Sequence, residues 1–258
     1  MLRIIDARTG RPVHAAPARR GLTRVEAHAS GSDTSDLRVL LVADLLSRAL
    51  ELGGTPVWSL LTGGHREAEL RAAATALGIR PFEEGHGLAA GLGEAQVVHV
   101  VAADGALPTS GVVVGVAPAL GTDSARKVPP AHGADEAGAA PPDRDAEPAV
   151  LRLALLATRR DAPVRVDPGA LDRAGRTLAH WRRAVARWAR QPSRPIPDEV
   201  RGRLRAAWED NLDVTEVLNV LNTVAEVADV PDGARFETYA YADRLLGLDL
   251  VRDIGSPA

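Results

Sequence analysis

The stretch "GSDTSDLRVLLVADLLSRALE", residues 31–51, decides the fold because a polar, turn-forming segment runs directly into a long apolar pattern. The pattern continues for about four helical turns and stops at Gly53-Gly54, which is too long for a strand. The sequence therefore predicts a helix over 37–52. In α/β enzymes that use nucleotides, such a junction usually carries the phosphate-handling residues. Here it carries Asp33, Thr34, Ser35 and Asp36.

Strands and helices alternate on both sides of this helix. The apolar runs "LRIID" and "LTRVEAHA" predict two strands before it. Three more strands are predicted after it, at "TPVWSLLTG", "AQVVHVVAA" and "GVVVGVAP". The segment "HREAELRAAATALGI" predicts a second helix, with Gly78 just past its end. This alternation favours an α/β domain over 1–116, with a parallel sheet and helices on its faces.

The order changes after residue 116. Residues 117–147 are rich in Pro, Gly and Ala and show no apolar period, so a flexible linker is predicted there. From Pro148 onwards the periodicity is helical, which predicts a helical region over 148–258. Its predicted helices span 147–158, 167–190, 198–208, 213–230 and 237–250. Asp213, followed by Glu216 three residues later, has the spacing of a capping box.

The composition narrows the class of protein. Hydrophobic residues make up 45% of the 258-residue chain, enough for a buried core. The sequence has no apolar run of the roughly 18 residues needed to span a bilayer, and its first residues lack a secretory pattern. Cysteine is absent, which excludes disulfides and thiolate metal ligands. We therefore expect a cytoplasmic protein.

The C-terminal half carries a family resemblance. Residues 147–185, "EPAVLRLALLATRRDAPVRVDPGALDRAGRTLAHWRRAV", resemble the segment that follows the catalytic core of cysteinyl-tRNA synthetases. Residues 206–228, "AAWEDNLDVTEVLNVLNTVAEVA", are similar to the acidic entry into that family's helical bundle, and "RLLGLDL" fits the end of the bundle. The related mycothiol cysteine ligases share this layout. The resemblance covers most of the chain and implies a shortened, Rossmann-like class I synthetase domain followed by a helical bundle.

The resemblance places the family's "HIGH" motif on Asp33-Thr34-Ser35-Asp36, and the family cysteine near Ala27 or His28. In the family, the two histidines of this motif contact the phosphates of ATP. Carboxylates at the same positions would repel them, since two unit charges about 4 Å apart interact by about 4 kcal/mol at an effective dielectric of about 20. The other interpretation is that these residues only cap the helix, as Asp, Thr and Ser commonly do.

The family's other two signatures are also altered. The "KMSKS" loop, whose lysines neutralise pyrophosphate, would correspond to the segment around "TDSARKVPP", where Arg126 and Lys127 are the cations. The other interpretation is an ordinary solvated loop. The family's zinc requires cysteine and histidine ligands, but the chain has no cysteine and its seven histidines show no close ligand spacing. We therefore predict no metal site, do not expect zinc, and interpret His99 as a core histidine.

A basic helix face is the remaining candidate site. Residues 151–207 hold fourteen Arg against five acidic residues, whereas 208–258 hold three Arg against eleven acidic residues. Opposite an apolar stripe that includes Trp181 and Trp188, which we assign to the core, five positions recur at helical spacing: Arg176, His180, Arg183, Arg187 and Arg190. This Arg stripe could bind tRNA or a protein partner. It could equally be a solvated face, or dock on the acidic segment.

These observations favour a degenerate cysteinyl-tRNA synthetase paralogue without aminoacylation activity, acting as a binding or regulatory protein. One alternative is an ATP-dependent ligase that forms aminoacyl adenylates in a rebuilt site. Asp33 and Asp36 would then hold magnesium, and Arg126 and Lys127 would meet pyrophosphate. Only this alternative requires ATP and magnesium as cofactors. A second alternative is nucleic-acid binding through the Arg stripe.

Overall fold

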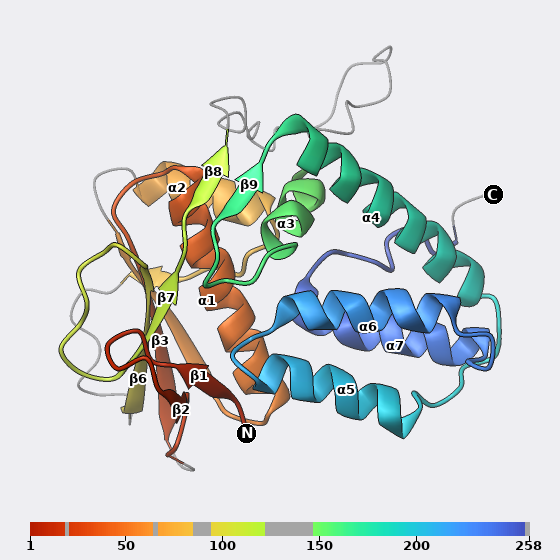
Figure 1. Ribbon diagram of the computed structural model, residues 1–258, viewed down its shortest axis with the longest axis horizontal. Coiled ribbons are helices and arrows are strands. Elements are labelled where there is room, and N and C mark those ends of the chain that lie inside the picture. Colours follow the sequence, from red (N-terminus) through yellow and green to blue (C-terminus); the bar gives the residue numbers. More distant parts are fainter. Residues whose placement is uncertain (19–20, 64–66, 85–93, 122–146, 256–258) are drawn as a thin grey trace.

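The computed structural model describes residues 1–258 except 19–20, 64–66, 85–93, 122–146 and 256–258 (Figure 1). The strands are β1 (Arg3–Ile5), β2 (Pro12–His14), β3 (Leu22–Ala29), β4 (Val57–Gly63), β5 (Glu83–Glu84), β6 (Glu94–Ala102), β7 (Val112–Val116), β8 (Ala119–Gly121) and β9 (Val164–Val166). The helices are α1 (Thr34–Leu52), α2 (Glu67–Ala76), α3 (Pro148–Leu156), α4 (Pro168–Trp188), α5 (Asp198–Glu209), α6 (Val214–Glu226) and α7 (Asp232–Leu246). Among the described residues, no helix is long and apolar enough to cross a membrane.

The main sheet has the strand order β5-β4-β3-β6-β7, and every pairing in it is parallel. β4 and β5 lie on one side of β3, whereas β6 and β7 lie on the other. The direction in which strands are added therefore reverses between β3 and β6. The predicted parallel α/β arrangement is confirmed, and β3 occupies the eight residues assigned to it from the sequence.

Helix α1 lies between the sheet and the C-terminal helices (Figure 1). It is buried on almost every side, which explains its nearly continuous apolar sequence. The helix begins at Thr34, three residues before the predicted start, because Asp33 caps it. One hydrophobic core runs without interruption from Ile4 and Val25 of the N-terminal part to Leu178 and Leu246 of the C-terminal helices.

The C-terminal helices confirm the predicted core role of two tryptophans. Trp181 and Trp188 of α4 are each 2% exposed, and both pack edge-on against Tyr239 of α7. Helix α7 begins at Asp232, five residues before its predicted start. The sequence does not indicate this start, because Gly233 lowers helix propensity. The same glycine lets α7 approach the loop at Pro192 closely. A Cβ atom on Gly233 would lie 2.0 Å from the Pro192 carbonyl oxygen.

The predicted linker over 117–147 begins with an ordered strand. Residues 119–121 form β8, which pairs in parallel with β9. Neither three-residue strand was predicted, because each is too short to show a period and depends on a partner more than forty residues away. Residues 122–146 of the predicted linker lie outside the described residues, and Glu147, its last residue, is the N-cap of α3.

Two buried arginines join the N-terminal and C-terminal parts. Arg38 of α1 donates five hydrogen bonds to backbone carbonyls, all of them after β7 in the chain. Arg152 of α3 donates to the carboxylate of Asp44 on α1 at 2.9 Å and to the carbonyls of Leu77 and Leu246. The side chains of Arg152 and Asp44 are both fully buried. Neither arginine was identified from the sequence, where each lies within an apolar run.

Candidate functional site

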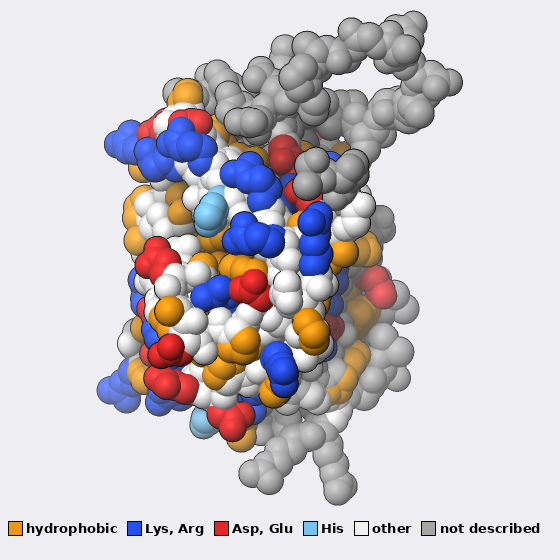
Figure 2. Space-filling view, turned by 90° about the vertical axis from the view of Figure 1, so that its right-hand side faces the viewer, with side chains coloured by type: hydrophobic (Ala, Val, Ile, Leu, Met, Phe, Trp, Pro, Cys, Tyr) orange, Lys and Arg blue, Asp and Glu red, His pale blue; other side chains and the backbone are white. Residues whose placement is uncertain are grey.

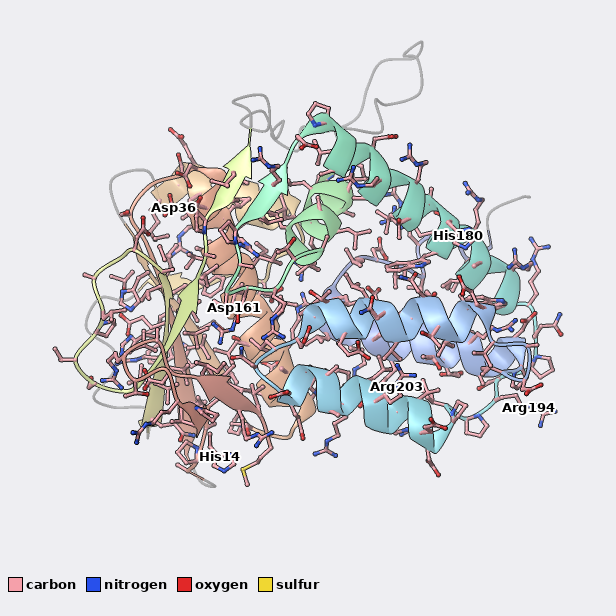
Figure 3. The ribbon with its side chains drawn as sticks, in the orientation of Figure 1. His14, Asp36, Asp161, His180, Arg194 and Arg203 are labelled. Atoms are coloured by element: carbon pink, nitrogen blue, oxygen red, sulfur yellow. The ribbon has the colours of Figure 1, made fainter. Side chains whose placement is uncertain are left out.

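The carboxyl edge of the sheet beside β3 and β6 is the candidate site. In open parallel α/β sheets, ligands bind outside the carboxyl ends of the strands, where the strand order reverses. That reversal lies between β3 and β6. The segment that follows β3 leads directly into α1, so it brings the predicted residues 33–36 to this edge. Asp36 is labelled at this edge in Figure 3.

The N-terminus of α1 is closed by a reciprocal capping box. The Asp33 carboxylate accepts hydrogen bonds from the amides of Ser35 at 2.8 Å and Asp36 at 2.9 Å. In return, the Asp36 carboxylate accepts from the amides of Ser30 at 3.2 Å and Asp33 at 3.4 Å. Asp33 and Asp36 therefore do cap the helix, as the capping interpretation predicts. Amides of the kind that bind a phosphate at other helix N-termini are already bonded to carboxylates.

The electrostatics of the cap also oppose a bound polyanion. Burial, followed by the nearby charge of Asp33, raises the pKa of Asp36 above its ordinary value, although backbone amides partly offset the shift. The raised pKa means that burial and the charge of Asp33 disfavour the ionised form of Asp36. A triphosphate placed here would meet two carboxylates and no lysine or arginine among residues 30–37.

The two middle residues of the segment have separate surroundings. The Ser35 hydroxyl donates to the Ala119 carbonyl at 3.3 Å or accepts from the Ala119 amide at 3.1 Å, which ties α1 to β8. Thr34 is the first helical residue and is half-buried. The other half of the predicted phosphate site, Arg126 and Lys127, lies outside the described residues.

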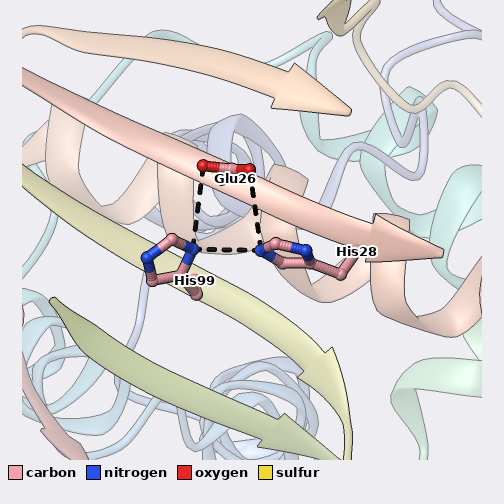
Figure 4. Close-up of side chains that lie close together, drawn as sticks. All are labelled: Glu26, His28 and His99. Atoms are coloured by element: carbon pink, nitrogen blue, oxygen red, sulfur yellow. Dashed lines mark hydrogen bonds and ion pairs between the residues drawn. The ribbon is translucent and has the colours of Figure 1, made fainter. Parts of the chain in front are cut away.

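A second cluster lies on the opposite face of β3 (Figure 4). Val25 and Ala27 are buried in the core with α1, so the alternation of the strand places Glu26 and His28 on the other face. His99 of β6 is the direct neighbour of Glu26. The His28 Nε2 and His99 Nδ1 atoms are 3.0 Å apart, and the Glu26 carboxylate lies 3.8 Å from the first and 3.7 Å from the second. We call these three residues the His–His–Glu cluster.

The surroundings of the cluster favour neutral imidazoles. Burial lowers the pKa of His99 to about 4, although the charge of Glu26 opposes the shift. Burial also lowers the pKa of His28. The Thr62 hydroxyl donates to Glu26 at 2.7 Å and orients that carboxylate. Neutral imidazole and carboxylate are common ligands of zinc and other first-row metals.

The spacing of the cluster suits one metal ion. Donor atoms bound tetrahedrally at about 2.1 Å from a metal lie about 3.4 Å apart. The two ring nitrogens, 3.0 Å apart, lie near that value. The Glu26 distances of 3.8 and 3.7 Å end on its two different oxygens, and one donor atom from each of the three residues lies within 4.8 Å of the others. The interpretation of His99 as a core residue is correct for its burial, but it missed the neighbours that β-pairing supplies. The available signal was the alternation of β3, in which Arg24, Glu26 and His28 share the half-buried face.

Arg176, His180, Arg183 and Arg187 of the Arg stripe lie on the solvent-exposed face of α4, which ends at Trp188, and Arg190 follows the helix in a turn. All five of its residues are exposed. Arg176 pairs with Asp172 on the same helix, and no ion pair links the other four to a carboxylate in the described part of the chain. Figure 3 marks His180 on this helix, and Figure 2 shows several basic side chains on the upper half of the adjoining face. Among the described residues, the Arg stripe therefore forms no ion pair with the acidic segment 208–258.

The fold and these contacts define a parallel α/β protein with an acid-capped helix at the strand reversal and a His–His–Glu cluster beside it. Searches of protein-family models and of curated proteins found no match to this sequence. The likeness to cysteinyl-tRNA synthetases consequently rests on the segments quoted above.

Proposed function

We propose that the protein is a synthetase-like binding or regulatory protein, built on a Rossmann-like domain and a C-terminal helical bundle, that does not form aminoacyl adenylates. The strand order supports the Rossmann-like assignment, because it matches the first five strands of the doubly wound order. The observation that carries the functional proposal is the capping box of Asp33 and Asp36.

Adenylate formation requires stabilisation of the charge on the reacting phosphates, which is usually the largest single contribution to catalysis of this kind. At the corresponding helix this protein presents carboxylates, and those carboxylates hold the local amides. A magnesium ion could reverse the sign of the interaction, as the ligase alternative requires. It would have to compete with the backbone amides for Asp33 and Asp36, and the cap would have to open.

ATP–pyrophosphate exchange with each of the twenty amino acids tests this proposal. We expect no exchange above the protein-free background, because residues 30–37 offer no lysine or arginine to the phosphates of ATP or to pyrophosphate. An active cysteinyl-tRNA synthetase assayed in parallel is the positive control. Exchange that disappears on Asp33→Ala would instead support the ligase alternative.

A second candidate function is metal binding, which the geometry of the His–His–Glu cluster favours. The three side chains offer two nitrogen donors and one oxygen donor, and leave further coordination positions for water or a ligand. Glu26 and His28 are half-buried, and His99 is buried. The hydrogen bond from Thr62 would hold the carboxylate in place, as outer-shell partners of metal ligands commonly do.

Titration with Co²⁺, followed by its visible absorption, tests metal binding. We expect one equivalent to bind, and the affinity to fall by about 100-fold or more in His99→Gln and by about 10-fold in Thr62→Val. The control is His14→Gln, which alters an exposed histidine on β2. Equal affinity in the wild type, His99→Gln and His14→Gln would rule out the cluster as the binding site.

Nucleic-acid binding through the Arg stripe remains a further proposal, supported by its exposed guanidinium groups. In gel-shift titrations with tRNA, we expect Arg183→Glu with Arg187→Glu to weaken binding by at least 10-fold. The slope of log K against log salt should also become shallower by about 1.5, because two phosphate contacts are lost. The matched control is Arg203→Glu with Arg205→Glu, the same charge change on α5. Equal binding by the two double variants would dismiss the stripe.

A further inference from the structure

A hollow of about 440 Å³ opens between α3, α4 and α6, with β9 at one end. This volume lies within the range of about 300–1,000 Å³ that is typical of small-molecule sites. Figure 1 shows β9 leading into α4 beside α3. The hollow belongs to the helical part of the protein and shares no lining residue with the capping box or the His–His–Glu cluster.

The inner wall of the hollow is apolar. Leu153 of α3, Val164 of β9, Trp181 of α4 and Leu218 of α6 line it, and each is buried. Trp181 is fixed on its far side by Tyr239, so the wall is already formed without a ligand. A wall of this kind suits the apolar body of a ligand, because burying apolar surface contributes about 25 cal/mol per Å².

The rim of the hollow is cationic. Arg165 and Arg173 line it and are exposed, and neither forms an ion pair with a carboxylate of the described residues. Thr177 and Asn222 add uncharged polar groups. Thr215 also lines the hollow, and its buried Oγ1 has no hydrogen-bond partner in the part of the chain that the structure describes.

Among the described residues, no carboxylate lines the hollow, and the acidic side chains nearby have other partners. Asp167 accepts from the Ala170 amide and caps α4. Asp172 pairs with Arg176. Asp213 caps α6 and pairs with Arg159 at 2.7 Å. The two guanidinium groups at the rim are therefore the charges that an entering ligand would meet.

We propose that this hollow binds a small organic anion, with its apolar body against Trp181 and Leu218 and its anionic group between Arg165 and Arg173. Guanidinium groups favour carboxylate, sulfonate or phosphate through paired, charge-assisted hydrogen bonds. The apolar wall selects against small inorganic anions. The site is separate from the N-terminus of α1, so a negative result for this proposal would not affect the function proposed above.

The test uses 8-anilinonaphthalene-1-sulfonate, an aromatic sulfonate that fluoresces on entering an apolar site. We expect the full chain to bind one equivalent. Binding should weaken by at least 10-fold in the double variant Arg165→Ala with Arg173→Ala. It should be abolished in Ala157→Trp, which places a large ring at an exposed lining position. Decanoate should displace the dye at least 10-fold more effectively than decanol.

The matched control is Arg183→Ala with Arg187→Ala, which removes the same charge from α4 outside the hollow and should bind the dye as the wild type does. Urea unfolding of each variant establishes that it is folded. Unchanged dye binding in both the double variant and Ala157→Trp would overturn the proposal. Equal displacement by decanoate and decanol would overturn the role of the two arginines.

Discussion

Replacing Asp44 with alanine is expected to lower the free energy of unfolding by about 3–5 kcal/mol, because it leaves a buried arginine without its counter-charge. The Asp44 carboxylate accepts hydrogen bonds from Arg152 at 2.9 Å, Arg48 at 2.9 Å and Arg80 at 3.0 Å. Arg152 is fully buried, so water cannot replace the lost partner without opening the contact between α1 and α3.

The same network makes this contribution sensitive to acid. Burial alone would raise the pKa of Asp44, but the charges of Arg152 and Arg48 and the hydrogen bonds from Arg152 and Arg80 hold it below its ordinary value. A carboxyl group with a lower pKa in the folded state stabilises the protein above its unfolded pKa of about 3.9. That stabilisation is lost as the pH falls through the folded pKa. The difference between wild type and Asp44→Ala should therefore be largest near pH 7 and shrink below about pH 4.

Urea unfolding at several pH values measures both effects. The control is Glu51→Ala, which removes the other, exposed partner of Arg80 and should cost less than about 1 kcal/mol. If Asp44→Ala and Glu51→Ala were equally stable at pH 7, the buried pair would not hold α1 against α3.

Replacing Arg38 with methionine is the other large expected effect, a loss of about 3 kcal/mol or more. Arg38 is 1% exposed and donates to the carbonyls of Ala117, Pro118, Thr158, Arg159 and Ala162. Each buried acceptor left without a donor costs about 1–3 kcal/mol. Burial lowers the pKa of Arg38 to about 10, partly offset by the charge of Asp161, an exposed residue that is labelled in Figure 3.

The loss of stability should differ between Arg38→Met and Arg38→Lys. Lysine at position 38 keeps the charge but cannot present a planar fork to five carbonyls, so Arg38→Lys should recover only part of the loss. The control Arg205→Met, at an exposed position on α5, should change stability by less than about 0.5 kcal/mol. A loss for Arg38→Met as small as that of the control would show that the carbonyls find other donors.

The elements that local patterns determine were predictable. β3 and the helical core of α1 follow from apolar runs bounded by turn-forming residues, and Trp181 and Trp188 follow from helical periodicity. β8 and β9 were not predictable, since their three-residue strands exist only through pairing with each other. The start of α7 was missed because Pro231 and Gly233 resemble a turn until the packing of Gly233 on the Pro192 loop is known.

In the candidate site too, some features follow from the local sequence and others only from the fold. The capping role of Asp33 follows from its residue type and position, and the reciprocal bonds of Asp36 fit the spacing of a capping box. The alternation of β3 places Glu26 and His28 on one face, but their meeting with His99, 71 residues after His28, could not be deduced because it depends on the register of β3 and β6. Arg38 and Arg152 illustrate a further limit: an arginine within an apolar run gives no indication of which carbonyls it will bind.

ATP–pyrophosphate exchange by the wild-type chain, beside the double variant Asp33→Ala with Asp36→Ala, tests the absence of adenylation most directly. With saturating MgATP and a mixture of the twenty amino acids, both preparations are expected to remain at the protein-free background. Exchange by the wild type above that background, lost in the double variant, would show that the acid-capped terminus of α1 handles a triphosphate after all.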